Sequence, residues 1–322
     1  MQINLHKNAR TTPAQRAFIQ NNPQMRISEL AMRIGVSETT IRRWKNRSFV
    51  YDKSHTPHNI RTSLTPEKEL AAVLLRNCLR LGLDDLHQVI RRFVFPKCSR
   101  SGLNRCLKRY GVSRLPSFQQ ALPVALNDYR GTFFYYTNVF LSGSAGQQGP
   151  LNIQVLMDYS FRVAFADISR LSFKSGMFFL NKVISQYPLS VRGIIYTDSI
   201  VLFDSDADSI EPDRGQEALI KTYCRVNDLV PQYLKSMTDA TLNNLRNIWS
   251  ALSKKRRNSF MNQLDSGKGN LLENIWTYNT RLPLRTLRRK TPIQSLQGHY
   301  LAFPGSFRQD PKQFYEAFLY HR

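Results

Sequence analysis

The chain has 322 residues, a length typical of two or three domains, and its 42% of hydrophobic residues can form a sizeable buried core. It has no run of about 18 apolar residues, no apolar stretch typical of a secretory signal and no Cys-x-x-Cys pair among its four cysteines, so we expect no membrane span, no zinc ribbon and no disulfide framework. The net charge of +23 implies a polyanionic partner, because Lys and Arg that neutralise phosphates release condensed counterions.

Positive charge is concentrated in the N-terminal part of the chain. Residues 1–115 hold 22 Lys and Arg against 7 Asp and Glu, whereas residues 116–322 hold 24 against 16. This asymmetry favours a nucleic-acid partner over a merely basic protein. We expect a protein of the bacterial cytoplasm, associated with the nucleoid, that binds double-stranded DNA and neither a membrane nor a small-molecule substrate.

Residues 1–48 are predicted to form a helix-turn-helix DNA-binding domain. A first helix is expected over 13–21, because Thr12 is a favourable N-cap and proline is favourable at the first helical position. Apolar residues at helical spacing predict a second helix that ends at Gly35, where glycine takes a positive φ at no steric cost. Ser28 is a candidate cap of this second helix.

The third helix of this domain, expected over 38–45 with Ser37 as its cap, is the candidate recognition helix. Helix, tight turn and helix is the arrangement in which the second helix enters the major groove of DNA. Ile41 and Trp44 are expected to face the core. The polar face left for DNA carries Thr39, Thr40, Arg42, Arg43 and Lys45. Arginine can bind guanine through two hydrogen bonds and a threonine methyl can contact a thymine methyl, although a merely solvated helix is the alternative.

Residues 49–63 lack an apolar period and are predicted to form an extended, basic linker that follows the DNA backbone. His55 and His58 lie in this linker, and we expect them to be solvated rather than to bind a metal ion. Residues 116–130 are expected to form a second linker.

Residues 64–115 are predicted to form a second helix-turn-helix or winged-helix-like domain. Three helices are expected, over about 66–80, 84–94 and 99–109. Thr65 is the expected cap of the first, and Gly111 closes the last. The polar face of the last helix carries the candidate DNA-contacting residues Ser101, Asn104, Arg105, Lys108 and Arg109. Two such units suit a long, asymmetric DNA site, although a purely structural helical bundle is the alternative for the second.

The patterning changes from helices to strands after residue 130. Three strands, a helix and a fourth strand are expected over 132–141, 151–159, 162–168, 173–186 and 193–197. This order resembles the ribonuclease-H-like fold, so 131–295 is predicted to be an integrase-core domain, followed by a tail, 296–322. The expected fold class is therefore α+β and multidomain, with two all-α units ahead of an α/β domain.

Five short motifs stand out along the chain by their order and spacing. They lie at 5–10, 158–165, 196–199, 278–281 and 290–292. The third motif, Tyr-Thr-Asp-Ser, is similar to Thr-Asp-Asn-Gly, the motif that carries the second catalytic aspartate in DDE-type transposases. By these motifs and their spacing, the chain resembles the DDE-type transposases of bacterial insertion sequences, in the retroviral-integrase superfamily, over about residues 5–296.

The resemblance implies phosphoryl transfer with two metal ions held by three carboxylates, and self-association as a dimer. The three carboxylate positions fall at Thr137, Asp198 and Arg246. A cation repels Mg²⁺ and one carboxylate cannot hold two ions, so we expect a vestigial site that uses no metal or other cofactor. The expected protein is a domesticated, catalytically inactive transposase that acts as a regulator or DNA-organising factor.

Two other functions remain open at this point. One is an active DDE-type transposase that carries out Mg²⁺-dependent DNA strand transfer with ligands placed elsewhere. The other is a structural or adaptor protein that binds a partner through the integrase-like domain.

Charged and aromatic residues crowd four further segments. The acidic segment consists of Asp204, Asp206, Asp208, Glu211 and Asp213. We expect a solvated loop there, because the calcium-loop pattern lacks its glycine and its final glutamate. The basic stretches 254–257 and 285–290 either touch phosphates or form solvated faces, and the aromatic tail, 296–322, is expected to be a docking or oligomerisation segment.

Overall fold

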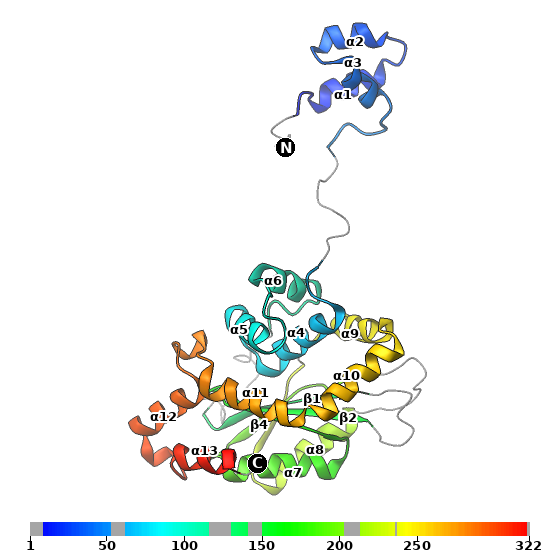
Figure 1. The fold of residues 1–322 in the computed structure, drawn as a ribbon. Helices are drawn as coiled ribbons and strands as arrows, with labels where there is room; N and C mark the ends of the chain where they lie inside the picture. Colours follow the sequence, from blue (N-terminus) through cyan, green and yellow to red (C-terminus); the bar gives the residue numbers. More distant parts are fainter. Residues whose placement is uncertain are drawn as a thin grey trace. The chain divides into compact units, whose positions relative to one another are not determined.

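The computed structural model describes residues 9–52, 62–115, 130–140, 150–202, 213–235 and 237–320. The chain falls into two compact units, Met1–Arg61 and Thr62–Arg322, and each is described by itself (Figure 1). The fold is mixed α/β, with helices in both units and a sheet in the second. Within the described ranges, no helix is long and apolar enough to cross a membrane.

Several features predicted from the sequence lie outside the described residues. They are most of both linkers, His55 and His58, the start of the first motif, and the acidic residues Asp204, Asp206, Asp208 and Glu211, together with the side chain of Asp213.

Three short helices surround a small apolar core in the first unit. They are α1 (Pro13–Asn21), α2 (Ile27–Ile34) and α3 (Glu38–Lys45). The buried core residues are Ile19, Leu30, Ile41 and Trp44. α1 has the predicted bounds because Thr12 and Gln15 form a capping box, in which each side chain accepts a hydrogen bond from the backbone N–H of the other residue.

The turn between α2 and α3 depends on a glycine. Gly35 has a φ of +76°, the left-handed conformation predicted for it, and its N–H donates to the Ala31 carbonyl. Ser37 is the N-cap residue of α3, as predicted. The prediction of Ser28 as a cap is wrong, because α2 begins at Ile27 and Ser28 lies inside its first turn.

A six-stranded sheet forms the centre of the second unit, with strand order β3-β2-β1-β4-β6 and with β5 beside β1. The strands are β1 (Thr132–Phe140), β2 (Leu151–Asp158), β3 (Ala164–Arg170), β4 (Gly193–Tyr196), β5 (Ile200–Leu202) and β6 (Val230–Tyr233). β1, β2 and β3 are antiparallel neighbours, whereas β4 and β5 run parallel to β1. Every residue of β1 is buried, because helices cover both faces of the sheet.

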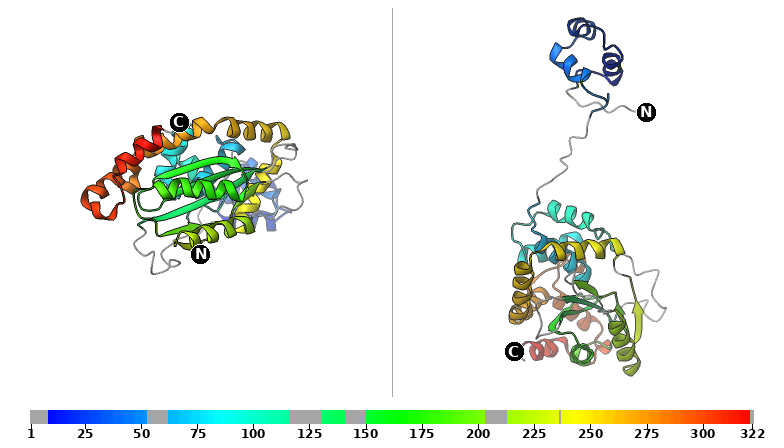
Figure 2. Two further views of the ribbon diagram at one scale, coloured as in Figure 1. Left: turned by 90° about the horizontal axis from the view of Figure 1, so that it is seen from below. Right: turned by 90° about the vertical axis from the view of Figure 1, so that its right-hand side faces the viewer.

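Alternate side chains of β1 enter two separate hydrophobic cores, one on each face of the sheet. Phe134, Tyr136 and Phe140 face the first core, and Phe133 and Tyr135 face the second. The first core is covered by α4 (Pro66–Leu79), α5 (Leu83–Phe93), α6 (Arg100–Arg109), α9 (Asp239–Ala251), α10 (Lys254–Ser266) and α11 (Lys268–Arg281). The second is covered by α7 (Phe173–Gln186), α8 (Asp213–Val226), α12 (Pro292–Ala302) and α13 (Pro311–Tyr320) (Figures 1 and 2).

The helices α4, α5 and α6 share a core with the sheet. Most faces of α4 are buried, and its buried residues include Leu70, Ala72, Val73 and Leu74. A helix that is apolar all round must lie between other elements. These helices were expected to form a domain of their own over 64–115, whereas their packing groups them with the sheet in one compact unit.

The C-terminal residues also belong to this unit. α12 crosses the expected boundary at 295, and Leu296 and Phe314 lie in the second core. These two side chains of the predicted docking segment therefore pack inside the unit.

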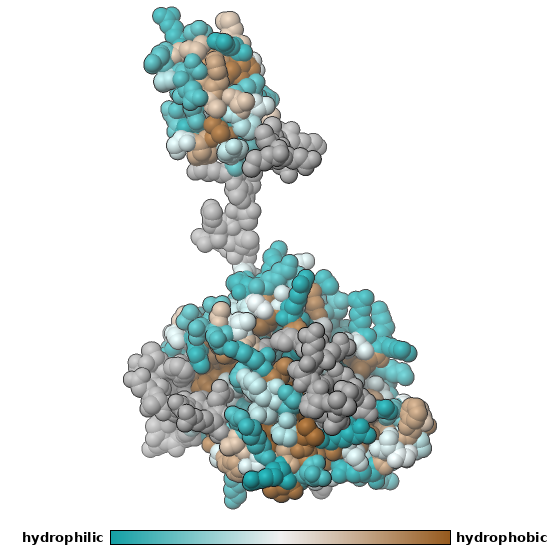
Figure 3. Space-filling view, turned by 180° about the vertical axis from the view of Figure 1, so that it is seen from behind, coloured by the Kyte–Doolittle hydropathy of each residue, from teal (hydrophilic) through white to brown (hydrophobic). Residues whose placement is uncertain are grey.

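On the face of the molecule drawn in Figure 3, hydrophilic and hydrophobic residues are mixed over both units.

Candidate nucleic-acid interface and sheet-edge site

The candidate recognition helix α3 is held on the first unit by two buried residues. Ile41 and Trp44 are buried, as predicted from their spacing. Arg16 of α1 is 2% exposed and its guanidinium lies 4.0 Å from the centre of the Trp44 ring, a cation–π contact. The same guanidinium donates to the Val50 carbonyl at 2.9 Å and pairs with Asp52 at 3.1 Å, which fastens the segment after α3 to α1.

The opposite face of α3 is available to solvent. Thr39, Arg42 and Arg43 are exposed, whereas Thr40 and Lys45 are half-buried. Thr40 exchanges a hydrogen bond with the hydroxyl of Ser37 at 3.0 Å, and Lys45 Nζ donates to the Met25 carbonyl at 3.1 Å.

One residue of this face, Arg42, has an acidic neighbour on the same helix. Its guanidinium lies 3.2 Å from the carboxylate of Glu38, and the two side chains are 63% and 48% exposed. An ion pair that is this exposed contributes little to the free energy of folding. Arg42 can therefore exchange Glu38 for a base or a phosphate at small cost.

The polar face of α6 divides into exposed cations and one cation that supports the fold. Ser101, Arg105 and Lys108 are exposed and Asn104 is half-buried. Arg109 differs, because its Nη1 donates to both carboxylate oxygens of Glu69 at 2.8 and 2.9 Å. The hydroxyl of Tyr110 donates to the same carboxylate at 2.9 Å. Glu69 is buried in α4, so Arg109 joins α6 to α4, a structural role that the sequence did not indicate.

Thr137, at the first of the three carboxylate positions, lies in a buried cluster of neutral polar groups. It is 3% exposed, and its Oγ1 lies 2.8 Å from the hydroxyl of Ser199. Both hydroxyls donate to Oε1 of Gln216, from α8, and Nε2 of Gln216 donates to the Thr197 carbonyl at 3.2 Å. The side chains of Thr137, Ser199 and Gln216 therefore bind one another.

Asp198 and Arg246 lie at the same end of the sheet. Asp198 follows β4 directly, is half-buried, and accepts a hydrogen bond from the hydroxyl of Tyr233. Arg246, on α9, donates through Nε to the Val201 carbonyl of β5 at 3.5 Å. β5 pairs with the last residues of β1, so all three positions predicted from the sequence come to one edge.

The described side chains at this edge do not by themselves fit a two-metal centre. Two divalent cations need several charged oxygen ligands, whereas the described side chains at this edge comprise one carboxylate, two hydroxyls, an amide and a guanidinium. Among the described residues, no three His, Cys, Asp or Glu side chains are grouped so as to hold a metal ion.

Two of the transposase-like motifs contact one another. Asp158 is fully buried and accepts hydrogen bonds from the Ser160 and Phe161 N–H groups and from the Tyr187 hydroxyl, each at 2.8 Å. Burial raises the pKa of Asp158 to about 6, against the lowering effect of these hydrogen bonds. Asn279, in the C-terminal motif, pairs with the backbone of Ala164, so both motifs stabilise the β2–β3 hairpin.

No family model matches the chain, and no curated protein matches it. Solved structures similar to it include the simian T-cell lymphotropic virus intasome in complex with PP2A regulatory subunit B56 gamma, at 12% identity over 71% of this chain and 71% of that chain, with a TM-score of 0.29. Another is the Mos1 strand transfer complex, at 10% identity over 92% of this chain and 80% of that chain, with a TM-score of 0.24. At TM-scores this low, neither likeness carries an argument about activity.

Proposed function

We propose that this chain is a sequence-specific DNA-binding protein with the organisation of a transposase. In this proposal α1–α3 form a helix-turn-helix domain that reads duplex DNA, and the sheet unit is a ribonuclease-H-like domain without catalytic activity. The observation that carries the proposal is the division of α3 into a face buried by Ile41 and Trp44 and a face that exposes Thr39, Arg42 and Arg43.

Charge and length both support α3 as the reading helix. Residues 1–61 hold 11 Lys and Arg against 3 Asp and Glu, so the first unit attracts phosphates without help from the rest of the chain. α3 has the length of a helix that fits the major groove, where arginine discriminates guanine and threonine contacts the thymine methyl.

The exposed residues of α6 support a second DNA contact. Ser101, Arg105 and Lys108 are exposed and Asn104 is half-buried, whereas Arg109 is committed to Glu69. We therefore propose α6 as a second DNA-contacting helix without Arg109. A role as a regulator or DNA-organising factor of the bacterial nucleoid, and action as a dimer, belong to the same proposal.

Loss of strand transfer is supported by the chemistry of the sheet edge. Thr137 and Arg246 cannot supply the negative charge that two divalent cations require, and Ser199 and Gln216 satisfy the Thr137 hydroxyl instead. Incubation of the full chain and a selected duplex with Mg²⁺ or Mn²⁺ should yield no nicked product. A nicking activity that Asp198→Ala abolishes would overturn this part of the proposal.

The binding proposal is tested by selecting duplexes from a random pool with the full chain and measuring affinities by fluorescence anisotropy. Arg42→Gln/Arg43→Gln should lower the preference for the selected duplex over a scrambled one by at least roughly 10-fold, since each base-reading arginine contributes about 1–3 kcal/mol. The matched control is Arg10→Gln/Arg26→Gln, which removes two exposed cations of the same unit outside α3. The control should leave the preference unchanged, and an unchanged preference in the α3 variant would refute the assignment of α3.

A further inference from the structure

A short basic loop follows α11 on the first-core side of the sheet. It comprises residues 285–290, begins with the 3-10 helix η2 (Arg285–Leu287), and contains three arginines and a lysine but no acidic residue. The cations Arg285, Arg288, Arg289 and Lys290 are all exposed. Leu284, directly before the loop, is buried in the first core, and Leu287 packs against that core.

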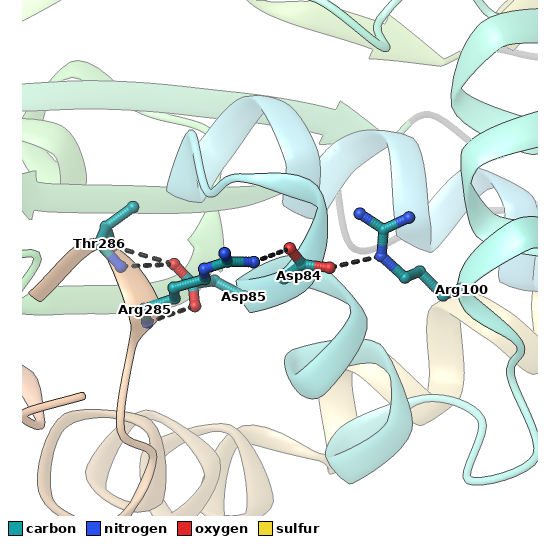
Figure 4. A network of polar contacts seen from close by, with 5 residues as sticks. All are labelled: Asp84, Asp85, Arg100, Arg285 and Thr286. Carbon is teal, nitrogen blue, oxygen red and sulfur yellow. Dashed lines mark hydrogen bonds and ion pairs between the residues drawn. The ribbon is translucent and has the colours of Figure 1, made fainter. Parts of the chain in front are cut away.

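Two neighbouring carboxylates of α5 hold the start of this basic loop (Figure 4). Asp85 is 1% exposed, and its oxygens accept hydrogen bonds from the Arg285 N–H at 2.6 Å, the Thr286 N–H at 3.2 Å and the Thr286 hydroxyl at 3.0 Å. Asp84 lies between two cations: one oxygen binds Arg100 of α6 and the other binds Arg285 at 2.7 Å. The basic loop and the first residue of α6 are therefore joined through a single carboxylate.

The end of the basic loop is held in a conformation that L-residues rarely adopt. Arg288 has a φ of +54° and Arg289 a φ of +63°. The bonds that maintain this conformation run from Arg289 N–H to the Leu284 carbonyl at 2.9 Å and from Leu284 N–H to the Lys290 carbonyl at 3.0 Å. Strained backbone persists only where its surroundings fix it, and such strain is concentrated at binding and catalytic sites.

Among the described residues, charge at this place is only partly balanced. Asp84 is shared by Arg100 and Arg285, so one carboxylate faces two guanidinium groups, and Arg288, Arg289 and Lys290 add three exposed cations. The second unit as a whole, residues 62–322, holds 35 Lys and Arg against 20 Asp and Glu. The partner that fits this surface is a polyanion.

We propose that the basic loop, together with Arg100, is a phosphate-binding surface through which the second unit contacts the backbone of duplex DNA without regard to sequence. The choice of DNA as the polyanion rests on the proposed function. The rigid frame explains how a loop of exposed arginines serves this purpose: the backbone is ordered before DNA arrives, so binding orders only side chains. Contacts of this kind fix the position of a protein on DNA and leave the reading of bases to other residues.

The test uses the full chain and measures affinity by anisotropy for the selected and the scrambled duplex, over about 50 to 200 mM salt. The variant is Arg288→Gln/Arg289→Gln. Glutamine carries a Cβ as arginine does, so the variant keeps the same left-handed backbone strain and changes only the charge. The slope of log affinity against log salt should become shallower by about 1.8, or about 0.9 for each phosphate that the variant no longer neutralises. Affinity should fall roughly 2- to 30-fold on both duplexes alike, since each exposed ionic contact contributes about 0.2–1 kcal/mol.

The matched control is Lys174→Gln/Arg225→Gln, which removes two exposed cations from α7 and α8 on the other face of the sheet. It should leave both slope and affinity close to those of the unaltered chain. Thermal unfolding of both variants within a few degrees of that chain ensures that a change in binding is not a loss of fold.

The outcomes separate this inference from the proposed function. An unchanged slope and affinity in the loop variant would overturn the inference, as would a weakening confined to the selected duplex, because the loop would then contact bases. Weaker binding to duplex RNA or an acidic peptide without weaker binding to DNA would also overturn it. Failure of the α3 variants to alter sequence preference would overturn the reading helix alone, since the loop effect remains measurable on scrambled DNA.

Discussion

The side-chain amide of Asn279 pairs with the backbone of Ala164 in both directions. Its Oδ1 accepts the Ala164 N–H at 2.9 Å, and its Nδ2 donates to the Ala164 carbonyl at 2.8 Å. The pair joins α11 to the start of β3 across 115 residues of sequence. Asn279, in a motif that resembles a transposase signature, therefore stabilises the fold by joining α11 to β3.

Replacement of Asn279 by aspartate tests this fastening. Asn279 is 7% exposed, and a carboxylate in its place would lose the donor and face the Ala164 carbonyl. We expect Asn279→Asp to lower the free energy of unfolding by about 2–4 kcal/mol, measured by urea denaturation near neutral pH. Asn274→Asp, an exposed position on the same helix, should change it little. Equal stability of the two variants would contradict the role given to Asn279.

The contact between Arg109 and Glu69 should be worth more to the fold than to DNA binding. Arg109→Gln leaves the buried carboxylate of Glu69 with Tyr110 alone, and we expect a decrease in stability of about 1–2 kcal/mol because the arginine itself is half-exposed. Arg105→Gln on the same helix should leave the melting temperature unchanged and weaken DNA binding instead. The assignment is wrong if the two variants exchange these effects.

Burial of Asp158 gives the second unit a defined dependence on pH. Its folded-state pKa of about 6 lies above the ordinary value of 3.8, so between these values the folded state holds a proton that the unfolded state has released. The stability from this group is fully present below about pH 4 and is lost as pH rises to about 6.

This dependence is measured as a difference between variants. The free energy of unfolding of the unaltered chain minus that of Asp158→Asn should fall between about pH 4 and pH 6 and be constant above. A difference that does not change between about pH 4 and pH 6 would show that the Asp158 proton does not take part.

The turn before α3 should depend on the absence of a side chain at Gly35. A Cβ there would meet no atom within 4 Å, so Gly35→Ala tests the left-handed backbone alone. We expect a decrease of about 1–2 kcal/mol in the stability of the first unit, measured by hydrogen exchange of the α3 amides. Gly305→Ala is the control, because its Cβ also has open space and its φ is not positive. A Gly35→Ala chain with unchanged exchange would exclude this account of the turn.

Local signals in the sequence predicted many elements well. α1 and α7 have the predicted bounds, since Thr12 caps one and Ser172 caps the other, and their apolar residues follow helical spacing. β5 and β6 were not predicted, because strands of three and four residues give no usable period. A helical pattern runs through residues 242–264, whereas the structure has two helices there, α9 and α10, with Ser253 capping the second.

Contacts between residues far apart in the sequence could not be predicted. The exposed face of α3 follows from spacing on one helix, so Thr39, Arg42 and Arg43 could be predicted. The partner of Arg109 lies 40 residues away, and Asp85 and Arg285 are 200 residues apart. Which cation supports the fold and which remains at the surface depends on such contacts, and these exist only after the chain has packed.

A ring of acidic side chains prepared for metal ions repels itself until the ions arrive. At the edge of this sheet beside Asp198, the side chains of Thr137, Ser199 and Gln216 bind one another through uncharged groups. These three described side chains carry no charge, so the hydrogen bonds among them involve no repulsion that a divalent cation would relieve, and they should persist when a chelator removes such cations.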